Sequence, residues 1–502
     1  MTPITTGRRR HHALRSVLAV VGVLVLGGNV LGQALQSRLE AAISNSAIGE
    51  TKFAVHVIDC TTNNVLASSN PDASMIPASN MKLLTSGAAL STLRPDFVFR
   101  TELLRQPATA TTPERIILKG SGDPALGDPK LLAAMGIKAD DIFDEWAKAA
   151  AKSGTVKPEV VIDDRVFDRQ YVHPTWPANQ LNRWYCSEVT GINYHTNLLA
   201  IFTDCREIGR PPRLTTEPSA PWIQITNKAR CVNEGRHSVW VAPQPNEPNT
   251  FILSGDARHA NEPVEVCLQN TPNVISRLLE DALNRAGVSP SKVRLADAEE
   301  TFPGATAIHV VQTPMSRVLD RCNKDSYNLY AECLLKRMGN VVTGAPGSWP
   351  NGSTVVRMVL LDRLGPAAGQ AFTVADGSGM SRENRVTTRM LAAWLVSLQS
   401  DETIADTFIA SLPKAGEEGT LRKRFHEHGI DLKNDVRAKT GYISGVSSLS
   451  GYVLGANGNR RVAFSIIAND KPNRVSLDAI WKLQESIVET IDKWITRAGD
   501  RG

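Results

Sequence analysis

Hydrophobic and polar positions follow two periods along the chain, one typical of helices and one typical of strands. Near the start, residues 35–43 have helical spacing, and residues 53–59 and 65–68 alternate as the two strands of a hairpin. Residues 78–93 return to helical spacing between two prolines, which limit where a helix can begin and end. The first hundred residues therefore predict a helix, a hairpin and a second helix.

The stretch from 97 to 302 has a different pattern. Short strand-like runs alternate with turns that contain Pro or Gly, and one helix is predicted near 140–152. Beyond residue 307 the pattern predicts several helices, three strands and a final amphipathic helix over 477–497. The fold class is therefore α/β (α+β), with one domain split into 35–96 and 303–502 by a β-rich insertion at 97–302.

Composition narrows the class of protein. The 502 residues are 42% hydrophobic and 21% charged, as in ordinary globular proteins, which excludes a disordered chain or a fibrous rod. The formal net charge is only +5, and no basic block lies outside the N-terminus. Nothing in the charge pattern therefore indicates a partner made of nucleic acid.

Residues 1–34 have the pattern of a secretory signal. Arg8, Arg9 and Arg10 precede an uncharged apolar run over 16–31, and small residues follow. The run is short for a membrane span, so cleavage is favoured, although an uncleaved anchor would hold the chain at the membrane surface. In both cases the sequence predicts an exported protein.

Seven cysteines occur, and four of them lie between residues 186 and 267. In an exported chain those four allow three disulfide pairings, between which the sequence does not choose. The odd total leaves at least one thiol free or paired with another chain. No Cys-x-x-Cys occurs and the histidines lack partners at ligand spacing, so we expect no metal and no cofactor.

Ser79 and Lys82 lie at the start of the helix predicted at 78–93. Residues three apart are nearly one turn apart, so the serine hydroxyl and the lysine ammonium face the same side. The free N–H groups of a helix start suit a serine that must become an alkoxide, and a desolvated lysine can act as its base. The spacing occurs twice more, but each of those copies contains a proline that breaks the turn. These copies are Ser289 with Lys292 and Ser411 with Lys414.

Lys439, Thr440 and Gly441 lie in the strand predicted at 436–443. The lysine offers a fixed cation for a carboxylate, and the glycine lets a substrate backbone approach and pair along the strand. A competing Lys-Ser-Gly at 152–154 ends a predicted helix, where the glycine is typical of a C-cap. We therefore discard the second match.

Ser326 and Asn328 come at the start of a helix predicted at 326–338. Residues two apart can project together from a turn, giving a hydroxyl that relays a proton and an amide that holds a substrate carbonyl or a lysine. Alone, Ser326 is better explained as a helix N-cap. A second Ser-x-Asn, at 68–70, lies in a turn without this context.

The three motifs together are more specific than any one of them. Ser-x-x-Lys at a helix start, then Ser-x-Asn, then Lys-Thr-Gly on a strand is the signature of penicillin-recognising serine enzymes. With a sequence separation of 247 between Ser79 and Ser326, the chain resembles the class C low-molecular-mass penicillin-binding proteins. These are D-alanyl-D-alanine carboxypeptidases/endopeptidases of the DacB type (serine peptidase family S13), which insert extra domains here, whereas class A β-lactamases place the motifs close together. Further segments similar to this family lie at 119–124, 376–381 and 419–421.

The resemblance implies a penicillin-recognising (β-lactamase/transpeptidase-like) fold and a role for each motif. Ser79 resembles the acylated nucleophile and Lys82 its base, and Ser326 and Asn328 resemble the second catalytic element. The third motif resembles the element that binds the substrate carboxylate, with Lys439, Thr440 and Gly441.

Two further roles follow from the same resemblance. The backbone N–H groups of Ser79 and Tyr442 would form the oxyanion hole. Asp163 resembles an acidic residue that binds the side-chain amine of a diaminopimelate-containing peptide, although its neighbour Asp164 is an alternative. An ordinary surface carboxylate at the end of a strand explains Asp163 equally well.

The implied activity is cleavage of the terminal D-Ala–D-Ala bond of peptidoglycan stem peptides, and of peptide cross-links, in the periplasm or cell envelope of a bacterium. β-Lactam antibiotics would then be covalent inhibitors. The alternatives are a β-lactamase or esterase on the same scaffold and a catalytically idle wall-binding protein. By the same resemblance the large insertion favours a polymeric substrate, and the complete motifs argue against an idle protein. We expect residues 97–302 to shape access to the polymer and not to build the acylation site.

Overall fold

The computed structural model describes residues 34–258, 262–455 and 461–499. The predicted signal or anchor over 1–34 lies outside these residues except for its last position. The chain divides into two compact units, each with its own hydrophobic core. One unit comprises the chain up to Pro77, Arg385–Ser400 and the chain from Pro413 onward, and the other comprises Ala78–Asn384 and Asp401–Leu412.

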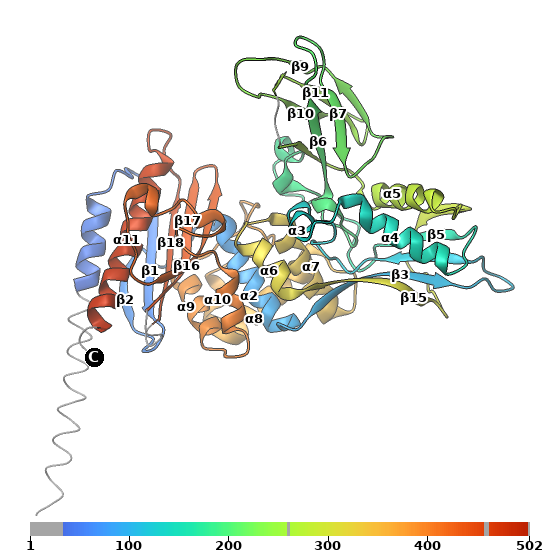
Figure 1. Cartoon of the computed structure of the whole chain (residues 1–502). Helices are drawn as coiled ribbons and strands as arrows, with labels where there is room; N and C mark the ends of the chain where they lie inside the picture. Colours follow the sequence, from blue (N-terminus) through green and yellow to red (C-terminus); the bar gives the residue numbers. More distant parts are fainter. Residues whose placement is uncertain (1–33, 259–261, 456–460, 500–502) are drawn as a thin grey trace, which may run out of the picture. The chain divides into compact units, whose positions relative to one another are not determined.

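The first unit is built on an antiparallel five-stranded sheet in the order β16-β17-β18-β1-β2 (Figure 1). Strands from the two ends of the chain meet at its centre, because β1 (Lys52–Asp59) pairs over its full length with β18 (Arg461–Asn469). The predicted hairpin is confirmed as β1 with β2 (Val65–Ser69). The sheet is completed by β16 (Asp435–Ile443) and β17 (Val446–Leu454).

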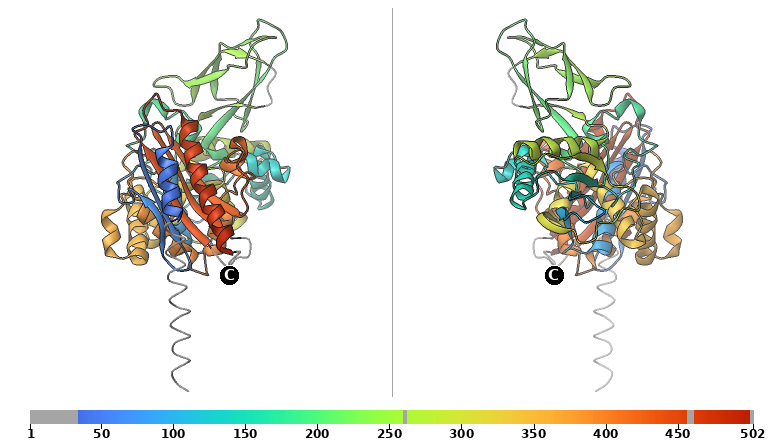
Figure 2. Two further views of the ribbon diagram at one scale, coloured as in Figure 1. Left: turned by 90° about the vertical axis from the view of Figure 1, so that its left-hand side faces the viewer. Right: turned by 90° about the vertical axis from the view of Figure 1, so that its right-hand side faces the viewer.

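Helices cover both faces of this sheet. Alternate residues of β1 point to opposite faces, and Phe53, Val55 and Val57 pack against the helix over 34–44 and α11 (Leu477–Gly499). These two helices lie next to each other over one face (Figure 2, left). The other face is covered by α9 (Thr388–Gln399), which contacts β1, β17 and β18.

The helical part of the second unit surrounds α2 (Met81–Leu93). Nearly every side chain of α2 is buried, as expected for a helix enclosed by other helices. The helices that contact it are α6 (Met315–Asn323), α7 (Asn328–Thr343), α8 (Trp349–Leu364) and α10 (Ala405–Ser411).

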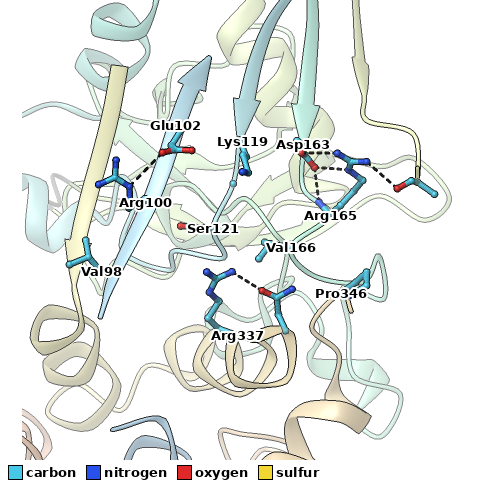
Figure 3. A pocket seen from close by; sticks show the side chains of 13 residues that line it. Val98, Arg100, Glu102, Lys119, Ser121, Asp163, Arg165, Val166, Arg337 and Pro346 are labelled. Atoms are coloured by element: carbon cyan, nitrogen blue, oxygen red, sulfur yellow. Dashed lines mark hydrogen bonds and ion pairs between the residues drawn. The ribbon is translucent and has the colours of Figure 1, made fainter. Parts of the chain in front are cut away.

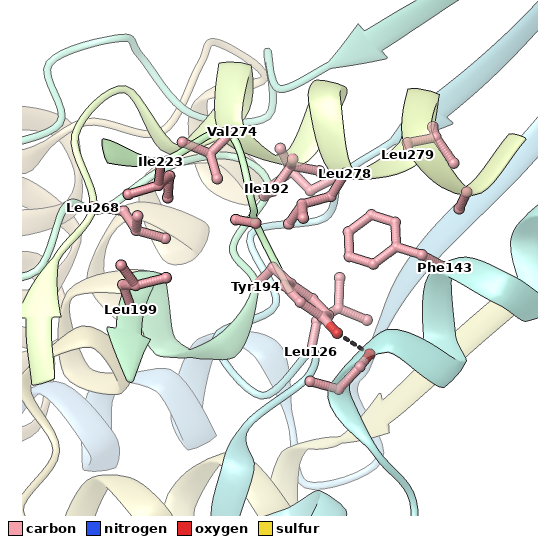
Figure 4. Packing of buried hydrophobic residues seen from close by; sticks show 14 of the residues in the cluster. Leu126, Phe143, Ile192, Tyr194, Leu199, Ile223, Leu268, Val274, Leu278 and Leu279 are labelled. Carbon is pink, nitrogen blue, oxygen red and sulfur yellow. Dashed lines mark hydrogen bonds between the residues drawn. The ribbon is translucent and has the colours of Figure 1, made fainter. Parts of the chain in front are cut away.

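The second unit also contains a mixed sheet in the order β14-β5-β4-β3-β15. Its apolar residues pack with α4 (Ala139–Lys152), α5 (Thr271–Arg285) and Tyr194, whose hydroxyl donates to the Ala139 carbonyl (Figure 4). Its strands are β3 (Val98–Gln106), β4 (Arg115–Lys119), β5 (Glu159–Asp163), β14 (Lys292–Leu295) and β15 (Thr306–Pro314). The domain boundary at 302 stays a prediction. However, β15 lies beyond 302 and pairs with β3, which lies within the predicted insertion.

Smaller sheets complete the region between 198 and 267. They join β6, β7 and β13 in one sheet, β8, β10 and β11 in a second, and β9 with β12 in a third. The strands are β6 (Leu198–Asp204), β7 (Arg213–Glu217), β8 (Gln224–Asn227), β9 (Arg230–Cys231), β10 (Trp240–Pro243), β11 (Thr250–Ser254), β12 (Asp256–Ala257) and β13 (Val264–Cys267). The short helix α3 (Pro129–Met135) lies before α4. The predicted β-rich texture of this stretch is confirmed.

Candidate active site

Ser79 lies in a short 3₁₀ turn, η1 (Ala78–Asn80), that runs directly into α2. The turn has an unusual backbone, since Ala78 has a φ of 47°. Gly379 packs so closely on this turn that a Cβ on it would lie 1.8 Å from the Ala78 carbonyl oxygen. Only glycine fits at position 379, and its φ of +86° also requires it.

Lys82 is fully buried one turn beyond Ser79 and makes three hydrogen bonds. Its Nζ donates to Ser79 Oγ at 3.0 Å, to Asn328 Oδ1 at 2.6 Å and to the Ser378 carbonyl at 2.9 Å. Burial lowers the pKa of Lys82 to about 8, because removal from water disfavours the ammonium more than the buried acids nearby favour it. A lysine of this kind is partly neutral near pH 8 and can accept the proton of the adjacent hydroxyl.

Ser326 and Asn328 lie where the chain turns into α7. Ser326 has a φ of 60°, in the left-handed region that non-glycine residues rarely adopt. Asn328 is the first residue of α7, and both the oxygen and the nitrogen of its side-chain amide form hydrogen bonds. Oδ1 accepts from Lys82, and Nδ2 donates to the Tyr185 carbonyl at 2.8 Å. The second motif is thus in direct contact with the first.

Glu332, one turn after Asn328 on α7, is a site residue that the sequence analysis did not identify. Its buried carboxylate accepts from the backbone N–H groups of Gly377 and Ser378 at 2.9 and 2.8 Å. It also accepts from Trp349 Nε1 at 2.8 Å. These bonds hold the Ser378 carbonyl that Lys82 contacts. Burial is the main cause that raises the pKa of Glu332, and the negative charge of Asp376 raises it further.

Asp376 shapes the same loop, which the sequence analysis had noted only as similar to the family. Its carboxylate accepts from the N–H groups of Gly379 and Ser381, at 2.8 and 2.6 Å, and from Asn384 Nδ2 at 2.7 Å. The signal that could have revealed both acids is an acidic residue in an otherwise apolar or small-residue stretch, because a buried carboxylate needs several donors.

A segment of the predicted insertion contributes to this site. Besides the Tyr185 carbonyl at Asn328, Trp176 Nε1 donates to Asp376 at 2.9 Å. Thr175 Oγ1 lies 2.6 Å from Ser381 Oγ. The expectation that residues 97–302 do not build the acylation site is therefore wrong in this respect, because backbone and side-chain groups from 175–185 position two of its parts.

The third motif lies in the other compact unit, on β16. Lys439 is fully buried, and its Nζ donates to the Thr440 carbonyl at 2.8 Å. Thr440 Oγ1 lies 2.8 Å from Thr420 Oγ1, in the 419–421 segment that is similar to the family. β16 is the first strand of its sheet, and Tyr442 is 57% exposed. The oxyanion hole expected from the N–H groups of Ser79 and Tyr442 stays a prediction.

The competing motif copies lie elsewhere. Ser411 ends α10, and Ser289 follows α5 in a loop. Lys152 ends α4, and Gly154 has the positive φ of a residue that terminates a helix. None of these three copies opens a helix.

Asp163 ends β5 and lines a pocket of about 490 Å³ (Figure 3). Arg165 holds both of its oxygens, with Nε and Nη2 at 2.8 and 2.9 Å. Asp164 instead accepts from Arg169 at 2.8 Å and from the Tyr171 hydroxyl at 3.1 Å. A substrate amine would have to replace Arg165 at Asp163, so the role of Asp163 stays a prediction.

One pair of the seven cysteines is joined by a disulfide. Cys205 and Cys231 form a disulfide, and the remaining cysteines are not disulfide-bonded: Cys60, Cys186, Cys267, Cys322 and Cys333. Within the described ranges, no cluster of three or more His, Cys, Asp and Glu side chains could hold a metal ion. In the same ranges, none of the helices has the length and hydropathy needed to cross a membrane.

Comparison with known proteins relates this geometry to a family. The model of the D-Ala-D-Ala carboxypeptidase 3 (S13) family matches residues 35–489. A D-alanyl-D-alanine carboxypeptidase of Actinomadura sp. (strain R39) is 29% identical, over 92% of this chain and 87% of that protein. The D-alanyl-D-alanine carboxypeptidase DacB of Haemophilus influenzae is 25% identical, over 80% and 82%.

The fold agrees with this relationship. The crystal structure of penicillin binding protein 4 (dacB) from Haemophilus influenzae matches 91% of this chain and 99% of its own, with a TM-score of 0.71 and 22% identity. The same protein has been solved in complex with a β-lactam. The predicted α/β fold of a penicillin-recognising enzyme is therefore confirmed. The chain belongs to the D-Ala-D-Ala carboxypeptidase 3 (S13) family.

Proposed function

We propose that this protein is a serine D-Ala-D-Ala carboxypeptidase that acts through an acyl-enzyme on Ser79. The observation that carries the proposal is the buried Lys82 ammonium, 3.0 Å from Ser79 Oγ and with a lowered pKa. A neutral Lys82 takes the hydroxyl proton while Oγ attacks the carbonyl of the penultimate D-Ala. The C–N bond then breaks, the terminal D-Ala leaves with a proton, and water releases the acyl group from Oγ.

The remaining motif residues act around this step. Asn328 holds Lys82 and can also orient the substrate amide, and Ser326 relays a proton toward the leaving amine. Lys439 and Thr440 bind the terminal carboxylate, and Gly441 lets the substrate backbone lie along β16. The N–H groups of Ser79 and Tyr442 stabilise the oxyanion.

The substrates are peptidoglycan stem peptides in the cell envelope of a bacterium, where an exported protein meets them. Cross-links carry the same D-configured carbonyl, so the enzyme also acts as an endopeptidase where the cross-link can enter. β-Lactams imitate the D-Ala–D-Ala bond and acylate Ser79. Asp163 binds the side-chain amine of the stem peptide after displacing Arg165.

The test is incubation with a stem pentapeptide and with purified peptidoglycan, followed by mass analysis. Loss of one alanine from the pentapeptide supports the carboxypeptidase, and loss of cross-linked species measures the endopeptidase activity. A fluorescent penicillin separates the alternatives. A label that persists for minutes supports a penicillin-binding protein, rapid release points to a β-lactamase, and no label points to an idle wall-binding protein.

A further inference from the structure

The pocket of about 490 Å³ in the second unit contains none of the three motifs, although Asp163 lines it. It is bounded by β3, β4, the end of β5 and the C-terminal half of α7, and Arg337 extends from the helix toward it (Figure 3). Arg337 is nine residues beyond Asn328, which at a rise of about 1.5 Å per residue puts it about 13 Å further along α7. The pocket also includes Lys119 and Ser121, from the 119–124 segment that none of the proposed catalytic steps uses.

The charges around this pocket are unequal. Four cations and two carboxylates line it. Arg165 is held by Asp163, and Arg100 lies 3.5 Å from Glu102. The other two cations, Lys119 and Arg337, have no ion pair among the described residues, so the pocket carries an excess of two positive charges.

Arg337 is partly buried without a counter-charge. Burial alone lowers its pKa, because no nearby carboxylate favours the guanidinium. One of its nitrogens donates to Asn340 Oδ1 at 2.8 Å, and the guanidinium lies over the Phe97 ring at 5.5 Å. Its Nε is buried and has no hydrogen-bond partner within the described structure. A buried guanidinium with an unsatisfied donor is uncommon unless something binds there.

Ser121 provides a second unsatisfied group. It is only 7% exposed, and its Oγ is buried without a partner in the described residues. The residue is fixed from both sides, since the Gly120 N–H donates to the Asp163 carbonyl and the Gly122 N–H to the Gly191 carbonyl. The backbone on both sides of Ser121 is therefore held in place, and Ser121 lines the pocket.

We propose that this pocket binds an anionic group, a carboxylate or a phosphate, carried by a cell-wall polymer. An oxyanion would accept from the Arg337 fork, from Lys119 and from the Ser121 hydroxyl, which satisfies the buried donors and the excess charge together. The argument for a bound anion uses only the residues of the pocket. The choice of a wall polymer as its source rests on the proposed function.

The test is binding of three probes measured by calorimetry: a stem peptide with free carboxylates, the same peptide with those carboxylates amidated, and a short glycerol-phosphate oligomer. Lys119→Gln and Arg337→Gln should each lower the affinity for the acidic probe by about tenfold or more, as expected for loss of a charge-assisted hydrogen bond. Lys157→Gln is the matched control, because it removes an equal charge from an exposed lysine that does not line the pocket.

The outcomes show which acidic group binds in the pocket and which results would contradict the proposal. A preference for the acidic over the amidated peptide that is lost in Lys119→Gln identifies a carboxylate in the pocket, because binding of the terminal carboxylate at Lys439 would survive that substitution. Binding of the oligomer alone identifies a phosphate. Lys119 is exposed, so Lys119→Gln should leave the fold intact, which thermal unfolding checks. If this variant binds all three probes with unchanged affinity, the proposal is overturned. Equal losses in Lys157→Gln also overturn it. Neither result depends on penicillin labelling, so failure of the proposed function would be seen separately.

Discussion

The amide oxygen of Asn328 lies 2.6 Å from the ammonium of Lys82, although 246 residues separate the two in the chain. The contact arises because α7 packs directly against α2, so the first residue of one helix meets the first turn of the other. Lys82 therefore has a neutral acceptor in Asn328, and no carboxylate of the described residues hydrogen-bonds to it. This arrangement allows burial to lower its pKa, since a contacting carboxylate would have kept the ammonium charged.

Lys82 and Lys439 are predicted to respond differently to arginine. Lys82→Arg should lose penicillin acylation by about 10²- to 10⁴-fold, because arginine cannot give up its proton at working pH and so cannot act as the base. Lys439→Arg should keep a measurable part of the acylation rate, because a cation for the substrate carboxylate remains. Acylation rates measured under one condition check this, and equal losses in both variants would show that the two lysines do not have separate roles.

The acylation rate should depend on pH through Lys82. Its pKa is lowered to about 8, so the neutral base becomes more abundant as the pH rises through that value. Below pH 8 the second-order acylation rate should fall by about tenfold per pH unit, and above it the rate should level off. Stopped-flow acylation across this range checks the prediction. A flat profile, or an increase that continues to the usual lysine pKa, would rule out Lys82 as the base.

Glu332→Gln should impair acylation through the position of Ser378. The amide keeps one acceptor oxygen but turns its NH₂ group toward N–H donors, and a buried mismatch of this kind costs about 1–3 kcal/mol. Because the Glu332 charge raises the pKa of Lys82, its removal should also move the pH inflection of acylation to lower pH. A purely structural role would reduce the amount of folded protein without moving the inflection. Glu299→Gln, at an exposed acid, is the control.

Asp163→Ala tests the residue assigned to the substrate amine. Turnover of a stem peptide with a free side-chain amine should fall by about 10- to 150-fold, as for loss of one charge-assisted contact, while acylation by a β-lactam without that amine should not change. Asp164→Ala is the comparison, since its carboxylate holds Arg169 and Tyr171. Similar losses on both substrates would assign Asp163 to holding Arg165, and a selective loss only in Asp164→Ala would move the role by one residue.

Local patterns were sufficient to predict the elements that carry the motifs. The alternation at 53–59 and 65–68 identified the β1–β2 hairpin, and helical spacing after Pro77 identified α2. The spacing at 477–497 identified α11. Each of these elements buries one face or lies in the core, so its period is imposed by packing and is visible in the sequence.

The supporting residues could not be predicted in this way, because their roles depend on contacts between distant segments. Glu332 acts on Gly377 and Ser378, 45 and 46 residues later in the chain. The Tyr185 carbonyl at Asn328 has no side-chain signal at all, since any residue supplies a backbone oxygen. The 3₁₀ turn at Ser79 packs closely against Gly379, a distant residue that no local pattern relates to it.

The measurement that tests the proposed mechanism most directly is the site of penicillin attachment. Wild-type protein and Ser79→Ala are each incubated with a fluorescent penicillin, and their intact and peptide masses are recorded while thermal unfolding confirms that both are folded. We predict one adduct on the wild-type protein, on the peptide that contains Ser79, and no adduct on the folded variant. An adduct that persists in Ser79→Ala, at Ser289 or Ser411 for example, would contradict the assignment of Ser79 as the nucleophile.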